Sequence, residues 1–189
     1  TFQFQSITTE QFLEFLNNEH PGVAESINIH SWVYEPGLPK DAPTPNLDRV
    51  REILTHADHF AQNDESSCDE IAKLSPNEWQ ILISRFGKSG SPELCERLET
   101  KFQILHSRNL EIRVSFLFLA INCGYEPAIE NTKNLLQKVG RMKYLRPLYS
   151  ALVNHSEDSR RVAIDIFNSA KQNYHPVAVN LVESLLEEE

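Results

Sequence analysis

Apolar residues recur at every third or fourth position along most of this chain, which is the spacing of one buried face of an α-helix. A short helix is predicted over 8–18, where Thr8 and Gln11 resemble a capping box. Eight further amphipathic segments follow Pro45, with apolar positions within 47–61, 79–86, 94–105, 110–121, 129–139, 145–152, 162–170 and 178–185. No segment shows the alternation of a β-strand, so the pattern predicts an all-α fold.

Local signals mark where some of these helices begin. Ser75 and Glu78 have the spacing of a capping box, and Ser91 precedes Pro92, which suits the first helical position. The segment 110–121 is apolar almost all round, and this predicts a central, buried helix. Its large apolar residues include Ile112, Val114, Phe116, Leu117, Phe118 and Leu119.

The number and length of the segments favour one architecture over another. Eight short amphipathic helices joined by tight turns suit a solenoid-like stack of antiparallel helix pairs, whereas a four-helix bundle would need longer helices. Two helix starts are similar, Tyr-Glu-Pro-Ala at 125–128 and Tyr-His-Pro-Val at 174–177, although two matches define no period.

A proline-rich segment separates the first helix from the others. Five prolines and two glycines lie between Pro21 and Pro45, a density that regular structure does not tolerate. Trp32 and Leu38 are apolar enough to be held against a surface, so we expect an ordered connector. The connector is predicted to join two folded bodies.

Composition and charge exclude several partners. A chain of 189 residues with 40% hydrophobic content suffices for one core, or for one core with an appended piece. The net charge of -9, from 18 Lys+Arg against 27 Asp+Glu, argues against nucleic acid or an anionic membrane surface as a partner. No apolar run approaches the roughly 20 residues of a membrane span, and no signal-peptide pattern is present.

The cysteines bear on the compartment. Cys68, Cys95 and Cys123 are odd in number and far apart in sequence, which indicates neither a disulfide framework nor a metal-binding pair. They are predicted to be buried thiols in a reducing compartment, which favours the cytoplasm. Because the chain begins with Thr1 and not with Met, we expect an excised fragment, and the localisation of the parent protein stays open.

No familiar catalytic motif is present: the sequence has no HExxH, GxSxG, P-loop or GxGxxG. The nearest approach to a metal pair is His56 and His59 on one helix face, with Asp58, His30 or Cys68 as conceivable third ligands. Histidines with this spacing on a polar face are more often solvated than metal-bound, so we expect no metal in this chain.

A cationic cluster at 140–147, Gly-Arg-Met-Lys-Tyr-Leu-Arg-Pro, is the strongest candidate binding site. Gly140 is predicted to end one helix in a left-handed conformation, which leaves Arg141 and Lys143 in or beside the first turn of the next. With Arg146 they oppose the helix dipole, at about 0.3–1 kcal/mol each when exposed. Such a pair at a helix N-terminus can bind a carboxylate, although the residues alone favour a surface cluster neutralised by nearby acids.

Four ordered motifs resemble one protein family. Trp-Val-Tyr-Glu-Pro-Gly-Leu-Pro at 32–39 resembles the linker that leaves the catalytic domain in the zinc aminopeptidases related to leukotriene A(4) hydrolase and aminopeptidase B. Glu-Ile-Arg at 111–113, the segment 140–148 and His-Pro-Val at 175–177 resemble the C-terminal helical domain of that family. The set spans nearly the whole chain, and it favours the carboxylate receptor over the neutralised cluster.

The resemblance implies a fold and a domain plan. The C-terminal domain of such enzymes is a two-layered, right-handed, armadillo-like superhelix of antiparallel helix pairs that closes one side of the active-site cleft. Residues 1–29 would be the end or a remnant of the catalytic domain, 30–45 an ordered linker and 46–189 the C-terminal helical domain. The zinc ion would be bound by the absent catalytic domain and not by this chain.

The resemblance also implies a function. Arg141 and Lys143 match the pair that, in the leukotriene hydrolase branch, binds the carboxylate of a peptide or of the lipid epoxide. We expect Arg141 to anchor a peptide carboxylate and Lys143 to assist. The chain is predicted to contain no catalytic residue and to be inactive alone, with the catalytic domain of the same polypeptide and short peptides as its partners. Epoxide hydrolysis depends on residues outside this sequence.

Two other interpretations remain open at the level of sequence. A free-standing helical-repeat module could bind a peptide or a partner helix in a concave groove without catalysis. A small metal-binding helical protein that uses His56 and His59 would require stoichiometric zinc, which we do not expect.

Overall fold

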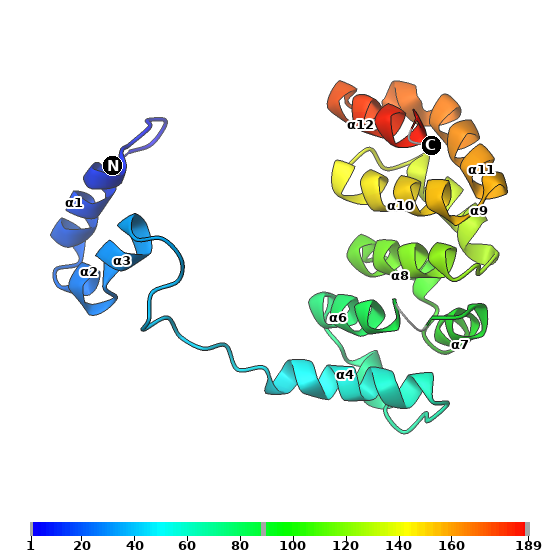
Figure 1. Cartoon of the computed structure of the whole chain (residues 1–189), viewed down its shortest axis with the longest axis horizontal. Coiled ribbons are helices and arrows are strands. Elements are labelled where there is room, and N and C mark those ends of the chain that lie inside the picture. Colours follow the sequence, from blue (N-terminus) through cyan, green and yellow to red (C-terminus); the bar gives the residue numbers. More distant parts are fainter. Residues whose placement is uncertain (1, 88–89, 188–189) are drawn as a thin grey trace. The chain divides into compact units, whose positions relative to one another are not determined.

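The computed structural model contains two compact units, Thr1–Asn46 and Leu47–Glu189, and describes residues 2–87 and 90–187. Every regular element in these described ranges is a helix, which confirms the all-α prediction (Figure 1). No helix within them is both long enough and apolar enough to span a membrane.

The first unit contains three short helices in its described part, α1 (Thr9–Glu19), α2 (Val23–Ser26) and α3 (Ile29–Tyr34). The capping box at the start of α1 is confirmed, because the backbone N–H of Thr8 donates to Gln11 Oε1 at 2.9 Å and Thr8 Oγ1 accepts from the backbone N–H of Gln11 at 3.3 Å.

The prediction that proline density excludes regular structure between 21 and 45 is wrong for α2 and α3. No proline lies between Pro21 and Pro36, and this interval accommodates both helices. Leu38 is 81% exposed, and Trp32 is about half covered, with 46% of its surface exposed. An ordered connector over 30–45 stays a prediction.

Nine α-helices form the described part of the second unit. They are α4 (Asp48–Ala61), α5 (Cys68–Ala72), α6 (Pro76–Phe86), α7 (Pro92–Phe102), α8 (Leu110–Asn122), α9 (Pro127–Leu136), α10 (Met142–His155), α11 (Glu157–Ala170) and α12 (Pro176–Glu187). Eight coincide with predicted segments. The sequence missed α5 because five residues are too few to show a helical stripe.

The helices of the second unit form two layers. Figure 1 shows α4, α6, α8, α10 and α12 stacked one on another, and successive members of this stack are in contact. The second layer contains α7, α9 and α11, which pack against the first layer and, for α9 and α11, against each other. The layers agree with a solenoid-like stack, and the right-handed superhelix stays a prediction.

The centre of the core is α8. Its buried side chains are Val114, Phe116, Leu117, Leu119, Ala120 and Ile121. Phe118 is the exception among the large apolar residues of this helix, because it is 43% exposed. The prediction of a central, buried helix is therefore confirmed for most of α8: neighbouring helices cover most of its surface, and one face stays open between α6 and α10.

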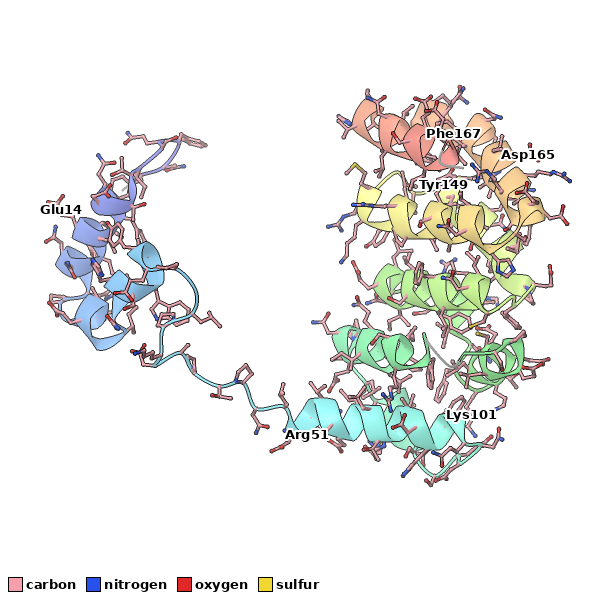
Figure 2. All side chains as sticks on the ribbon, viewed as in Figure 1. Glu14, Arg51, Lys101, Tyr149, Asp165 and Phe167 are labelled. Atoms are coloured by element: carbon pink, nitrogen blue, oxygen red, sulfur yellow. The ribbon has the colours of Figure 1, made fainter. Side chains whose placement is uncertain are left out.

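Two buried tyrosines, Tyr149 and Tyr174, link the C-terminal helices. Figure 2 labels Tyr149 beside Phe167, and the centres of these two rings are 6.3 Å apart. The hydroxyl of Tyr174 donates to the carbonyl oxygen of Leu136 at 2.7 Å and lies 3.1 Å from the hydroxyl of Tyr149. Since the proton of Tyr174 is used for Leu136, Tyr149 is the donor between the two hydroxyls. Burial raises the pKa of both tyrosines, so both stay protonated.

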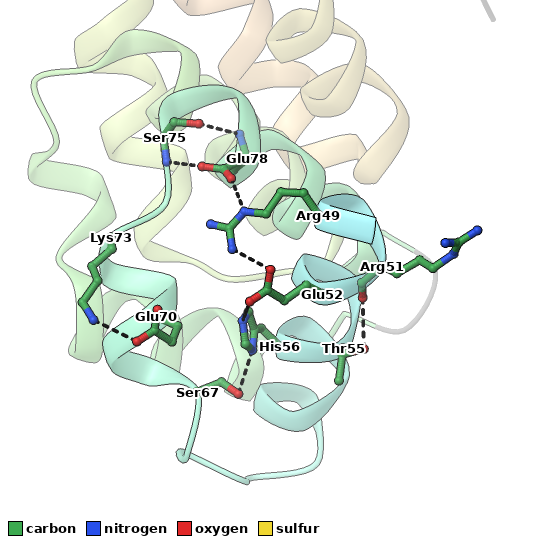
Figure 3. A network of polar contacts seen from close by, with 10 residues as sticks. All are labelled: Arg49, Arg51, Glu52, Thr55, His56, Ser67, Glu70, Lys73, Ser75 and Glu78. Carbon is green, nitrogen blue, oxygen red and sulfur yellow. Dashed lines mark hydrogen bonds and ion pairs between the residues drawn. The ribbon is translucent and has the colours of Figure 1, made fainter. Parts of the chain in front are cut away.

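The predicted helix caps are confirmed, and one of them extends into an ion pair. Figure 3 shows the backbone N–H of Ser75 donating to Glu78, which also accepts from Arg49 of α4. These two bonds measure 2.7 and 2.6 Å. The hydrogen bonds from Ser75 and Arg49 lower the pKa of Glu78 to about 2. At the start of α7, Ser91 Oγ accepts from the backbone N–H of Leu94 at 3.2 Å.

The three cysteines are free thiols. Cys68 and Cys95 are buried as predicted, whereas Cys123 is only partly buried. The fold makes neighbours of Cys95 and Cys123, and the hydrogen bond between them raises the pKa of Cys95. Gly90 packs against Cys123, because a Cβ added to it would lie 2.5 Å from Cys123 Sγ.

Candidate functional site

The connection that precedes α10 differs from its prediction at Gly140. The glycines with a positive φ in the described ranges are Gly22, Gly37 and Gly124, so the left-handed Gly140 was wrong. The preceding helix ends earlier, at Leu136. The backbone N–H groups of Lys138 and Val139 both donate to the carbonyl of Leu135. Because this satisfies a terminal carbonyl without left-handed backbone, no glycine cap is needed.

The helix that begins at this connection presents the predicted cations. Arg141 is the extended N-cap residue of α10, and Lys143 lies in its first turn, as predicted. The guanidinium carbon of Arg141 lies 5.6 Å from the ring centre of Tyr144, which is a cation–π contact. Because the ring of Tyr144 is buried, it is a fixed support for an otherwise exposed arginine.

A carboxylate from the neighbouring helix neutralises one of the cations. Lys143 Nζ lies 2.6 Å from Glu111 Oε2, and the hydroxyl of Tyr144 donates to Glu111 Oε1 at 2.9 Å. These two bonds hold the pKa of Glu111 below its ordinary value, so Glu111 is ionised at neutral pH. Asn109 caps α8 by accepting from the backbone N–H of Glu111, and this cap fixes the position of Glu111 in the first turn of the helix.

The charge balance of the cluster is therefore uneven. Lys143 is compensated by Glu111, as the neutralised-cluster interpretation predicts for it. In the part of the chain that the structure describes, the guanidinium of Arg141 forms no ion pair with a carboxylate. Arg141 thus has donors available for an external anion, held at a helix N-terminus where backbone N–H groups also lack partners within the helix.

A groove of about 810 Å³ extends from this cluster across the open face of α8. Its lining side chains come mainly from α6, α8 and α10, which Figure 1 shows as successive helices of the first layer. We call it the α8 groove. Along α8 it is lined by Glu111, Ser115, Phe118 and Asn122, which lie on one face of the helix. Its apolar lining consists of Ile83, Val114, Phe118, Leu119 and Pro147. Lys143 and Tyr144 also line it, so the groove reaches the ion pair of Lys143 with Glu111. Arg141 is not part of the lining, but its guanidinium lies over the ring of Tyr144, which is.

The histidine pair belongs to a different network, in which Figure 3 shows His56 between Ser67 and Glu52. His56 Nδ1 lies 3.0 Å and His59 Nδ1 3.4 Å from the same hydroxyl of Ser67. The carboxylate of Asp58, one conceivable third ligand, is instead paired with Arg85 at 2.8 Å. Residues 2–87 and 90–187 contain no group of three His, Cys, Asp or Glu that could hold a metal ion.

Sequence reasoning identified the two cations but missed the residues around them. The sequence pattern alone gives Tyr144 no role of its own and does not pair Glu111 with Lys143, which lies 32 positions away. A usable signal for the groove was the spacing of Glu111, Ser115 and Phe118, which places polar, small and aromatic residues on one face of an otherwise apolar helix.

The fold and the site define a class of protein, namely an all-helical domain of stacked helices with a cationic cluster beside an apolar groove. Residues 74–186 match the family described as leukotriene A4 hydrolase, C-terminal. The chain belongs to this family, and the resemblance found in the sequence is confirmed.

Curated relatives match almost the entire chain. Leucine aminopeptidase 2 of Coccidioides immitis (strain RS) is 27% identical over 192 residues, which cover 97% of this chain and 30% of the relative. Leukotriene A-4 hydrolase of Xenopus laevis is 27% identical over 191 residues, covering 96% of this chain and 31% of the relative. The chain therefore spans about a third of the length of such relatives.

Solved structures share the fold. Native yeast LTA4 hydrolase superimposes with a TM-score of 0.76 at 24% identity, over 97% of this chain and 33% of the yeast chain. A second structure of the native enzyme, from Saccharomyces cerevisiae, gives a TM-score of 0.77 at 23% identity. This agreement supports the all-helical fold class.

Proposed function

We propose that this chain is the C-terminal domain of a zinc aminopeptidase and that it binds the carboxylate of a peptide substrate. The observation that carries the proposal is the family match over 74–186, a region that includes both Arg141 and Lys143. The similarity to leucine aminopeptidase 2 over 97% of the chain supports removal of residues from the N-terminus of peptides as the activity of the whole polypeptide.

The described residues of this chain do not fit a zinc site, because no group of three potential ligands exists among them. We therefore assign the metal and the bond-breaking chemistry to the remainder of the polypeptide. The contribution of this domain is restricted to positioning the substrate. Its expected partners are the catalytic domain of the same polypeptide and short peptides.

The geometry supports Arg141 as the anchor for the carboxylate. A guanidinium presents two parallel N–H donors to a carboxylate. The contact with the ring of Tyr144 already restricts the rotamers of Arg141, so its side chain loses less conformational entropy when a carboxylate binds. Lys143 already pairs with Glu111, but its ammonium group has three donors and can accept a second anion. Arg141 anchors in this scheme, and Lys143 assists electrostatically.

Kinetics of the full-length polypeptide test the proposal. A tripeptide with a free C-terminus and the same tripeptide as a C-terminal amide separate carboxylate recognition from catalysis. Arg141→Ala should lower the ratio of kcat/KM for the acid over the amide by about 10- to 100-fold, the value of a charge-assisted hydrogen bond pair. Arg51→Ala, which removes an exposed arginine of α4, is the matched control and should leave the ratio unchanged.

Two results would contradict the proposal. An acid-to-amide ratio that Arg141→Ala leaves unchanged would remove the assigned role of this residue. A full-length polypeptide without aminopeptidase activity would instead favour the free-standing interaction module. Separately, the chain tested alone should hydrolyse neither peptide, since no catalytic group has been assigned to it.

A further inference from the structure

The α8 groove combines an apolar surface with one charged end, where Lys143 pairs with Glu111 beside Arg141, a cation that forms no ion pair within the described residues. Four of its apolar residues come from three different helices, namely Ile83 from α6, Val114 and Leu119 from α8, and Pro147 from α10. Lys143, a charged residue, lines the same groove, and its side chain is 55% exposed. A ligand that matches both features must carry a negative charge next to an apolar group.

Phe118 is the residue of this groove that the fold alone does not explain. It lies on the most apolar helix of the domain, yet 43% of its surface is exposed to solvent. An exposed aromatic ring inside a concave, apolar site contributes nothing to the core and gains free energy when a second apolar group covers it. Phe118 is therefore placed to contact a ligand.

The spacing along α8 specifies the size of that ligand. At a rise of about 1.5 Å per residue, Ser115 lies about 6 Å and Phe118 about 10 Å along the helix axis from Glu111. Ser115 has a small side chain, and its hydroxyl donates to the carbonyl oxygen of Glu111 at 2.8 Å. The side chain therefore lies against its own helix and leaves space above it in the groove. One large side chain that starts beside the Glu111–Lys143 pair can cover Ser115 and reach the ring of Phe118.

We propose that the α8 groove binds the side chain of the C-terminal residue of a peptide substrate and selects large apolar residues there. This inference rests on the proposed function, since it takes the carboxylate of the same residue to be held by Arg141 and Lys143. The argument for this occupant is charge complementarity: Glu111 compensates only one of the two cations, so the carboxylate of the ligand balances the other, and the side chain attached to it follows the apolar floor. Phe118 is then a residue that determines specificity.

The test compares two tripeptides, Ala-Ala-Phe and Ala-Ala-Gly, as free acids with the full-length polypeptide. The wild-type enzyme should prefer the peptide that ends in phenylalanine. Phe118→Ala should reduce the ratio of kcat/KM for the Phe peptide over the Gly peptide by about three- to tenfold, the value of one aromatic contact. The matched control is Ile164→Ala, which truncates a similarly exposed apolar residue on α11 and should preserve the ratio.

A second variant changes the groove in the opposite direction. Ser115→Leu fills the floor between Glu111 and Phe118 and should reduce the same ratio, because the larger residue occupies the volume meant for the substrate side chain. Agreement between a variant that removes a contact and one that removes space would support the assignment. Thermal unfolding of each variant shows whether it is folded.

The outcomes separate this inference from the proposed function. If the preference for acid over amide is present but neither Phe118→Ala nor Ser115→Leu alters the Phe-to-Gly ratio, the inference is overturned and the carboxylate site stands. If acid and amide are cleaved equally, the proposed function fails first. If Phe118→Ala lowers the Tm of the full-length polypeptide without altering the ratio, another part of the polypeptide covers the groove, and the inference is wrong.

Discussion

Lys143 and Glu111 join α10 to α8 at the charged end of the α8 groove, with Nζ and Oε2 2.6 Å apart. The two side chains are 55% and 26% exposed, so the pair is partly screened by solvent. Glu111 also accepts from Tyr144 at 2.9 Å, so Lys143 is not the only group that holds this carboxylate in place. On the proposed function, the same acid would compete with the peptide carboxylate for Lys143.

Removing that competition should improve binding of free-acid peptides. Glu111→Gln keeps an acceptor for Tyr144 but removes the negative charge, and the KM for a free-acid tripeptide should fall by about two- to fivefold, the scale of a partly exposed ion pair. The matching amide, measured with the same variant, serves as the control. A KM for the acid that rises would mean that Glu111 acts mainly by holding Lys143 in position.

The buried tyrosine pair predicts unequal costs for two similar substitutions. Tyr174→Phe leaves both the carbonyl of Leu136 and the hydroxyl of Tyr149 without their partner, and should lower the free energy of unfolding by about 2–3 kcal/mol. Tyr149→Phe removes only one donor and should cost about 1 kcal/mol. Urea unfolding of both variants measures the difference, and equal losses would contradict the assigned direction of the hydrogen bonds.

Close packing at Gly90 predicts a destabilising effect from a single methyl group. In Gly90→Ala the new Cβ would lie 2.5 Å from Cys123 Sγ and 3.1 Å from the carbonyl oxygen of Phe86, so the free energy of unfolding should fall by about 1–3 kcal/mol. Gly87→Ala is the control, because its Cβ would lie 3.4 Å from the nearest atom. Its effect should stay within about 1 kcal/mol.

A double variant locates the cause of the Gly90 effect. If the contact with sulfur is responsible, Cys123→Ala should recover part of the stability lost in Gly90→Ala, and the two changes should not be additive. Strict additivity of the two free energies would point instead to the contacts with Phe86 and Leu119, each at 3.1 Å.

The cap of α6 predicts a particular dependence on pH. The folded protein holds the pKa of Glu78 at about 2, below the value of 4.5 that this carboxyl has without its partners. Its contribution to stability is therefore complete above pH 4.5 and is lost as the pH falls from 4.5 through 2. The difference in Tm between wild type and Glu78→Gln should be largest at neutral pH and should shrink below pH 4.5. A difference that is constant from pH 7 to pH 2 would contradict the low pKa.

Sequence alone predicted the features of this protein that depend on neighbours along the chain. Helix caps such as Ser75 with Glu78 are recognisable because their partners lie within one turn, and the apolar stripes revealed eight of the helices for the same reason. Local signals failed where a helix can end in more than one way. Gly140 was expected to cap the preceding helix in a left-handed conformation, but that helix ends at Leu136 without a glycine cap.

Tertiary structure decided the relations between distant positions. Glu111 is 32 residues before Lys143, and the two meet only because α8 and α10 are adjacent in the stack. Cys95 and Cys123 are neighbours for a similar reason. Phe118 has the same apolar character as the buried residues beside it, and only the absence of a helix over that face of α8, within the described chain, leaves it exposed. Periodicity shows which face of a helix is apolar, whereas packing decides which faces are covered.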